Sequence, residues 1–128
     1  MTSQMPGIAK SYVRSVNDRD PAAFIALFGV HAVVDDAGRA FRGLAEIKEW
    51  GNREIFAARV TLEVMNCVGG EEEATVTAKV DGEFDRAGLP DPVVINHHIR
   101  TEGGKIVALA CRLAGDEANS GVQPAGQE

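Results

Sequence analysis

Two adjacent carboxylates, Asp35 and Asp36, end the short apolar stretch Ala32-Val33-Val34. A carboxylate at the end of an apolar strand is costly unless water or a hydrogen-bonding partner is close. The position also suits a general base, because apolar surroundings make a carboxylate a stronger proton acceptor. We therefore take Asp36 as the candidate proton-transfer residue. The alternative is a turn-forming Asp whose side chain binds the backbone near Gly38.

Strand alternation separates the two carboxylates, because successive side chains of a β-strand point to opposite faces. Only one of Asp35 and Asp36 can therefore face the interior, and the sequence leaves open which one does. The adjacent His97 and His98 are separated in the same way, so they cannot bind one metal ion together. No other His, Cys or carboxylate group has the spacing of a metal site, so we predict neither a metal nor a cofactor.

The composition excludes several classes of partner. The 128 residues suit one domain, and the net charge of −6 argues against nucleic acid, which would require a basic surface. No apolar run reaches the roughly 20 residues needed to cross a bilayer, and the first residues lack the pattern of a signal peptide. We expect a cytoplasmic protein that binds neither nucleic acid nor membrane. Its two cysteines, Cys67 and Cys111, are expected to be reduced core residues.

Three amphipathic helices are predicted in the first half of the chain. The first begins near Pro6 and carries Tyr12 on its apolar face. Asp20-Pro21 is an N-cap and first-turn pair that starts a second, short helix, which we expect to end at Gly29. A third helix follows Gly43 and is expected to fray after residue 51. The apolar faces of the second and third helices carry Phe24, Leu27, Phe28, Leu44, Ile47 and Trp50.

Six strands are predicted, beginning with two short ones over residues 32–36 and 40–42. From residue 59 the apolar residues alternate, which indicates four longer antiparallel strands that Gly69-Gly70 and Gly103-Gly104 help to separate. This order predicts an α+β fold with helices on one face of a curved sheet. The single domain is expected to span residues 1–114, and residues 115–128 are expected to be disordered.

Three passages of the sequence resemble a known superfamily: SYVRSVNDRDPAAFIALF, VVDDAGRAFRGLAEIKEW and VVINHHIRTEGGKIVALACRL. They are similar to the NTF2-like superfamily, specifically its SnoaL-like and ketosteroid-isomerase-like members, over about residues 6–114. The resemblance implies a cone-shaped domain, in which a curved mixed or antiparallel sheet and three helices enclose a pocket.

The resemblance also implies roles for individual residues. In ketosteroid isomerases a strand-end Asp moves the proton, while a Tyr and a protonated Asp stabilise the enolate oxygen. The matching positions here are Asp36, Tyr12 and Asn96, whose amide donates a weaker hydrogen bond than a carboxylic acid. If Asn96 faces inward, alternation turns His98 inward and His97 outward. The expected substrate-binding residues are Trp50, His98 and Phe28.

Two functions of different classes fit these features. The first is an isomerase, cyclase or lyase that moves a proton next to a carbonyl of an apolar small molecule, with Asp36, Tyr12 and Asn96 as its catalytic residues. The second is a non-catalytic domain that binds a hydrophobic ligand or only dimerises. In either case we expect a homodimer through the outward face of the sheet. To that face we assign Val93, Ile95, His97 and Ile99.

Overall fold

The computed structural model describes residues 5–115, and within that part of the chain it contains three α-helices and one six-stranded sheet. The helices are α1 (Gly7–Asn17), α2 (Pro21–Ala26) and α3 (Gly43–Gly51), and α3 continues into a π-helical turn over Asn52–Phe56. The strands are β1 (Phe28–Asp36), β2 (Arg39–Arg42), β3 (Thr61–Gly69), β4 (Glu73–Asp81), β5 (Val93–Glu102) and β6 (Lys105–Leu113).

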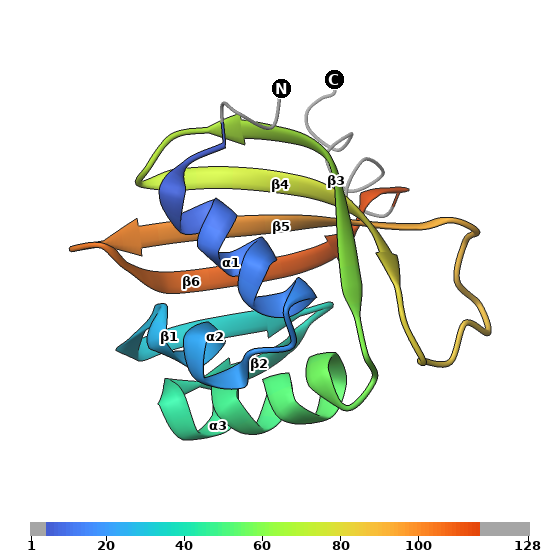
Figure 1. Cartoon of the computed structure of the whole chain (residues 1–128), viewed down its shortest axis with the longest axis horizontal. Helices are drawn as coiled ribbons and strands as arrows, with labels where there is room; N and C mark the ends of the chain where they lie inside the picture. Colours follow the sequence, from blue (N-terminus) through green and yellow to red (C-terminus); the bar gives the residue numbers. More distant parts are fainter. Residues whose placement is uncertain (1–4, 116–128) are drawn as a thin grey trace.

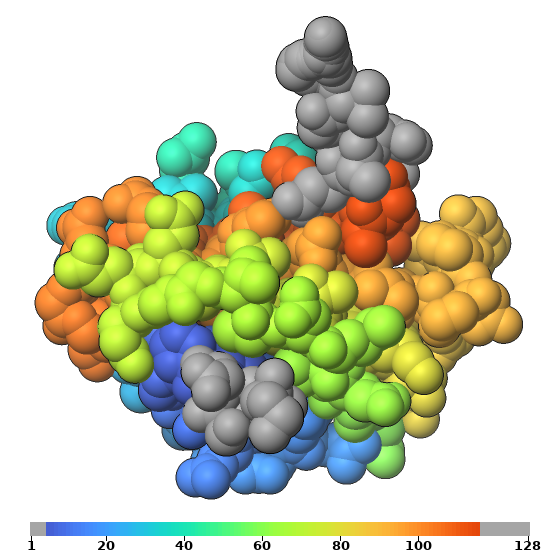
Figure 2. Space-filling model, turned by 90° about the horizontal axis from the view of Figure 1, so that it is seen from above, coloured from blue at the N-terminus to red at the C-terminus, as the bar shows by residue number. Residues whose placement is uncertain are grey.

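The six strands form one mixed sheet in the order β2-β1-β6-β5-β4-β3. The pair β1 and β6 is parallel, and every other neighbouring pair is antiparallel. Helix α1 lies across the strands of the curved sheet, and α3 lies beside β1 and β2 (Figure 1). The connection between β4 and β5 projects at one end of the molecule, as Figure 2 also shows in yellow to orange. This arrangement confirms the predicted α+β fold.

The core lies between the helices and the inner face of the sheet. Strand β4 shows the pattern most clearly, because its alternate apolar residues are buried and the intervening polar ones are not. The buried set is Ala74, Val76, Ala78 and Val80. From the helical side Tyr12, Val16 and Phe24 pack into the same core, each with 1% of its surface exposed. The amphipathic pattern of α1 therefore places Tyr12 in the interior.

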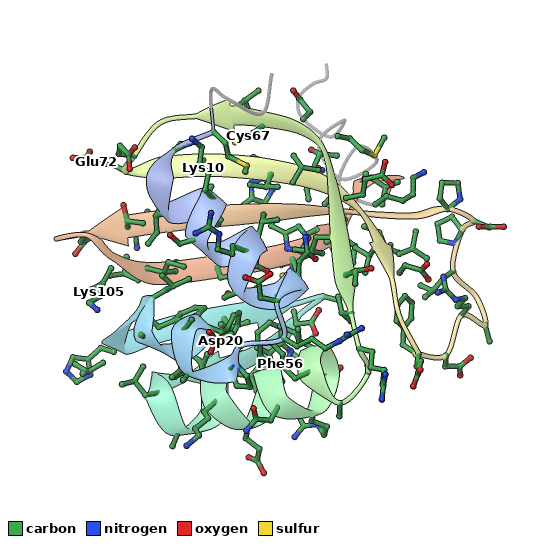
Figure 3. The ribbon with its side chains drawn as sticks, in the orientation of Figure 1. Lys10, Asp20, Phe56, Cys67, Glu72 and Lys105 are labelled. Carbon is green, nitrogen blue, oxygen red and sulfur yellow. The ribbon has the colours of Figure 1, made fainter. Side chains whose placement is uncertain are left out.

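Several local predictions can be compared with the structure. Asp20 caps α2, because its Oδ1 accepts a hydrogen bond from the backbone N–H of Ala23 at 3.1 Å, and Figure 3 shows it at the start of that helix. The helix ends at Ala26, so the prediction that it continues to Gly29 is wrong. Gly29 instead lies in β1, which begins at Phe28 because Phe28 pairs with β6. The predicted disordered tail, apart from Gly115, lies outside the described residues.

Candidate functional site

A cavity of about 450 Å³ lies between α1, α3, the inner face of the sheet and the connection between β4 and β5. Most of its wall is apolar, including Val16, Leu62, Val80, Phe84, Leu89 and Val93. Aromatic rings pack behind the helical wall: the Phe24 ring lies 6.3 Å from Trp50 and 5.5 Å from Phe56, measured between centroids. Phe56 lies beside α2 and α3 (Figure 3). An apolar wall with a few polar groups is typical of a small-molecule site.

Asp36 lies in the cavity wall, at the end of β1. Its Oδ2 accepts a hydrogen bond from Trp50 Nε1 at 3.0 Å and one from Arg39 Nη2 at 2.6 Å. Trp50 is 3% exposed and lines the cavity from α3. The packing of α3 on β1 therefore holds the carboxylate of Asp36 beside the cavity.

Asp35 is the turn-forming carboxylate that binds the backbone at Gly38, a role that the sequence analysis had considered for Asp36. Its Oδ1 accepts a hydrogen bond from the backbone N–H of Gly38 at 2.9 Å, and both of its oxygens accept from Arg112 at 2.9 Å. These hydrogen bonds hold the pKa of Asp35 below its ordinary value, with the bond from Arg112 as the largest cause. The question left open by strand alternation is thus decided: of the two carboxylates, Asp36 lines the cavity.

Arg39 joins Asp36 to a second acid, Glu54. The turn Ala37-Gly38 has positive φ at both residues, 54° and 93°, which is the pattern of a two-residue hairpin, and it sets Arg39 opposite Asp36. The guanidinium of Arg39 also donates to Glu54 Oε1 at 3.1 Å and Oε2 at 3.2 Å. These bonds lower the pKa of Glu54. Sequence analysis missed this chain of charges, although the hairpin signal could have paired Arg39 with Asp36.

A second polar group in the wall is buried and uncharged. Tyr12 Oη lies 2.9 Å from His97 Nδ1, and Cys111 Sγ lies 3.7 Å from the same nitrogen. Burial lowers the pKa of His97 to about 4 and raises the pKa values of Tyr12 and Cys111. The imidazole, phenol and thiol are therefore all neutral at pH 7. His97 Nε2 has no hydrogen-bond partner within residues 5–115.

The prediction that Asn96 and His98 face the pocket and that His97 faces outward is wrong. Asn96 Oδ1 accepts a hydrogen bond from Thr77 Oγ1 at 2.6 Å, and His98 Nδ1 lies 2.8 Å from Thr75 Oγ1. Both partners belong to the outer face of β4, whereas His97 is 5% exposed and contacts Tyr12. The structure therefore places Tyr12 with Asp36 in one cavity wall and places Asn96 on the opposite face of the sheet.

The physical reason is the apolar side of β5. Its alternate residues Val93, His97 and Ile99 are buried, and Ile95 lines the cavity. These are the four residues that the sequence analysis assigned to an outward dimer face, so that assignment is also wrong. Phe28 is buried as well, but it packs against Phe24 at a centroid distance of 5.1 Å and does not line the cavity.

Within residues 5–115 no group of three or more His, Cys, Asp or Glu side chains is placed to hold a metal ion. None of the described helices combines the length and the apolar character needed to cross a membrane.

Comparisons with known proteins identify the fold and the family. A candidate polyketide cyclase from Sinorhizobium meliloti is 26% identical, with a TM-score of 0.77 over 88% of this chain and 99% of that one. A Mycobacterium tuberculosis protein in complex with estradiol-17β-hemisuccinate is 18% identical, with a TM-score of 0.71 over 85% and 92% of the two chains. A Catenulispora acidiphila protein with a ketosteroid isomerase-like fold, in complex with trimethylamine, is 21% identical, with a TM-score of 0.69 over 83% and 84%.

None of the curated proteins matches the chain. The SnoaL-like domain family matches residues 9–109, which is most of the chain and includes β1, α3 and the His97 region. Together with the NTF2-like fold shared with these solved structures, this match shows that the chain belongs to the SnoaL-like domain family.

Proposed function

We propose that the cavity binds an apolar small molecule with a carbonyl group, and that Asp36 transfers a proton at the carbon next to that carbonyl. The observation that carries the proposal is that Asp36 and Tyr12 line one cavity of about 450 Å³. A carboxylate can accept the proton, and a neutral phenol can donate a hydrogen bond to the oxygen on which negative charge develops.

The contacts of Asp36 support a role as the proton acceptor. Both donors within hydrogen-bond distance, Trp50 and Arg39, contact Oδ2, and no described residue donates to Oδ1. We assign the proton transfer to Oδ1. It takes a proton from the carbon next to the carbonyl, and the C–H electron pair forms the enolate. Oδ1 then returns the proton to the same carbon or, where a conjugated C=C bond extends the enolate to a dienolate, to its γ carbon. The two contacts on Oδ2 fix the orientation of the carboxylate.

The oxygen of the ligand would be held by Tyr12 without Asn96, which lies on the other face of the sheet. Two solved relatives support a small-molecule pocket: the Mycobacterium tuberculosis protein contains a steroid ester, and the Sinorhizobium meliloti protein is a candidate polyketide cyclase. These ligands and activities belong to those proteins. They favour an apolar, oxygen-bearing ligand class for this chain.

A non-catalytic binding domain is the second candidate. The observation that favours it is the 2.6 Å contact of Arg39 with Asp36, because a carboxylate that holds a guanidinium has a structural role without any reaction. In this case the cavity binds the same ligand class, and Asp36 serves to anchor Arg39 and Trp50.

Binding of a phenolate, which mimics an enolate, tests the proposal. Trp50 is the only tryptophan in the sequence and lines the cavity, so its fluorescence reports on ligand binding. We expect Asp36→Asn to bind a nitrophenolate on the order of tenfold more tightly than wild type, because a like charge is removed. Binding of the neutral methyl ether should change little. Equal or weaker phenolate binding by Asp36→Asn would favour the non-catalytic domain.

We also propose a homodimer through the outer face of the sheet, although for different residues than the sequence suggested. Val33, Ala108 and Ala110 are partly buried on β1 and β6. Charged side chains on this face are paired. Asp35 binds Arg112 through two hydrogen bonds, and Arg100, which lies opposite Ala108, donates to Glu102 at 3.1 Å. Small apolar side chains and paired charges favour close contact with a second sheet. A cytoplasmic location stays a prediction.

A further inference from the structure

The contact between Tyr12 and His97 joins α1 to β5 inside the cavity wall. The oxygen and nitrogen atoms are 2.9 Å apart, and the two side chains are 1% and 5% exposed. Such a short contact between two buried groups must contain one proton, supplied either by the phenol or by the imidazole. The identity of the donor decides whether Tyr12 has its own proton left for a ligand.

The surroundings of His97 favour a neutral ring. Tyr12 and Cys111 contact it inside the cavity wall, and the neighbouring His98 lies on the opposite face of the sheet, where it contacts Thr75. None of these three neighbours carries a negative charge that would stabilise an imidazolium. Asp36 lines the same cavity, but its carboxylate is paired with Arg39. Burial opposes a charge on the ring. A neutral imidazole carries a single N–H, either on Nδ1 or on Nε2.

The unpaired nitrogen distinguishes between these two tautomers. Nε2 is buried and has no hydrogen-bond partner among the described residues. With the proton on Nε2, a buried N–H donor would be left unpaired, which is rare in folded proteins. With the proton on Nδ1, only a lone pair is left at Nε2, and the N–H donates to Tyr12 Oη. The second arrangement makes the Tyr12 hydroxyl the donor that needs a partner, and a ligand oxygen can supply one because Tyr12 lines the cavity.

We propose that His97 is a positioning residue that donates from Nδ1 to Tyr12 Oη and directs the Tyr12 proton towards a neutral carbonyl oxygen in the cavity. The inference rests on the proposed function and narrows its ligand class to uncharged carbonyl compounds. A carboxylate is disfavoured here because Asp36 places a like charge in the same cavity and because Tyr12, His97 and Cys111 are neutral. The guanidiniums in the wall are already held by acids, Arg39 by Asp36 and Glu54 and Arg112 by Asp35.

The first test needs no ligand. In protein labelled with ¹⁵N-histidine, the coupling pattern between ring nitrogens and carbon-bound protons distinguishes the two neutral tautomers. The His97 signals are identified by their loss in His97→Asn, and His31 and His98 serve as internal references. We expect a neutral ring with the proton on Nδ1 at pH 7. A proton on Nε2, or a charged ring, would overturn the proposal.

The second test measures selectivity with three probes of one shape, followed through Trp50 fluorescence. They are 2-acetylnaphthalene, 2-isopropenylnaphthalene, which replaces the carbonyl oxygen with CH₂, and 2-naphthoate. Wild type should bind the ketone about fivefold more tightly than the alkene, as one neutral hydrogen bond predicts. The carboxylate should bind more weakly than the ketone. Tyr12→Phe should abolish the preference for the ketone.

Variants of His97 separate positioning from packing. His97→Asn retains an amide donor close to the position of Nδ1 and should keep most of the preference for the ketone. His97→Leu has no donor and should reduce it to less than about twofold. His98→Asn, on the outer face, is the matched control and should leave it unchanged. Wild-type selectivity in a folded His97→Leu would overturn the proposal. If His97→Leu fails to fold, loss of the preference for the ketone in His97→Asn would overturn the proposal.

The two proposals fail in different ways. If wild type binds none of the probes, the proposed carbonyl pocket is wrong, and the ¹⁵N pattern alone then decides the tautomer of His97. If the probes bind with the expected selectivity and no proton transfer occurs, the positioning role stands and the catalytic function fails.

Discussion

At the scale of single residues, the cavity wall separates charged groups from neutral ones. Asp36, Arg39 and Glu54 form a hydrogen-bonded chain in which the Arg39 side chain is 52% exposed. Tyr12 and His97 are almost fully buried and uncharged. A ligand in the cavity would therefore meet a charged group near water and a neutral hydrogen-bonding pair in the interior. This polarity suits a molecule with an apolar body and one carbonyl oxygen.

The contact between Arg39 and Glu54 predicts a pH-dependent contribution to stability. The pKa of Glu54 lies below its ordinary value of 4.5 because Arg39 donates hydrogen bonds to its carboxylate. A lowered pKa in the folded state adds stability above the unfolded pKa, and this stability is lost as the pH falls through the folded pKa. Arg39→Met should lower the free energy of unfolding by less than about 1 kcal/mol at pH 7, because solvent screens the pair. The difference should shrink below pH 4.5.

Urea denaturation of wild type and Arg39→Met at pH 7 and pH 3.5 measures this difference. Arg59→Met is the control, because Arg59 forms only a surface contact of 3.8 Å with Glu83 and should have little effect at either pH. A difference that stays constant or grows on acidification would contradict the assignment of the pKa shift to Arg39.

The sequence predicted part of this site. Asp36 could be found because a carboxylate at the end of an apolar strand is unusual, whereas Tyr12 entered only through a family resemblance. Glu54 was missed because it approaches Arg39 only when the π-helical turn folds back onto the β1–β2 hairpin. A contact that depends on the relative position of two elements leaves no periodic signal in either of them.

At the scale of elements, β5 shows how one assumption can reverse a whole strand. The sequence analysis assigned Asn96 to the inner face by matching it to a family position. Strand alternation then placed each neighbouring residue of β5 on the wrong face. A one-residue slip in a strand exchanges its two faces. The apolar series Val93, Ile95 and Ile99 carried the correct signal, because burial of three large apolar side chains outweighs the placement of one amide. His97 lies in the same series.

Element boundaries show a related limit. The Asp20 cap and the glycine turns were predicted, because each depends on a few adjacent residues. The start of β1 was missed by four residues, because residues 28–31 become strand by pairing with a distant segment. That partner is β6, and it runs parallel to β1. Local sequence patterns therefore predicted the start of an element more reliably where that start did not depend on pairing with a distant segment.

At the scale of the whole molecule, the open outer face of the sheet predicts a homodimer. Ala110→Glu places a charge among the small residues of this face and should convert the dimer to a monomer, because a buried unpaired carboxylate is costly. Ala45→Glu, the same change at an exposed position of α3, should leave the dimer intact. Sedimentation equilibrium at micromolar concentration measures the mass. A monomeric wild type would contradict the prediction, as would an Ala110→Glu variant that remains dimeric.

The central claim is that Asp36 transfers a proton at the carbon next to a carbonyl. The most direct measurement is hydrogen–deuterium exchange of the methyl protons of 2-acetylnaphthalene in D₂O, followed by ¹H NMR with and without protein. The account predicts exchange by wild type above the buffer rate and a loss of at least about 100-fold in Asp36→Asn, which retains the cavity but lacks the base. The claim would be contradicted if Trp50 fluorescence shows that wild type and Asp36→Asn both bind the ketone while exchange proceeds at the buffer rate with either protein.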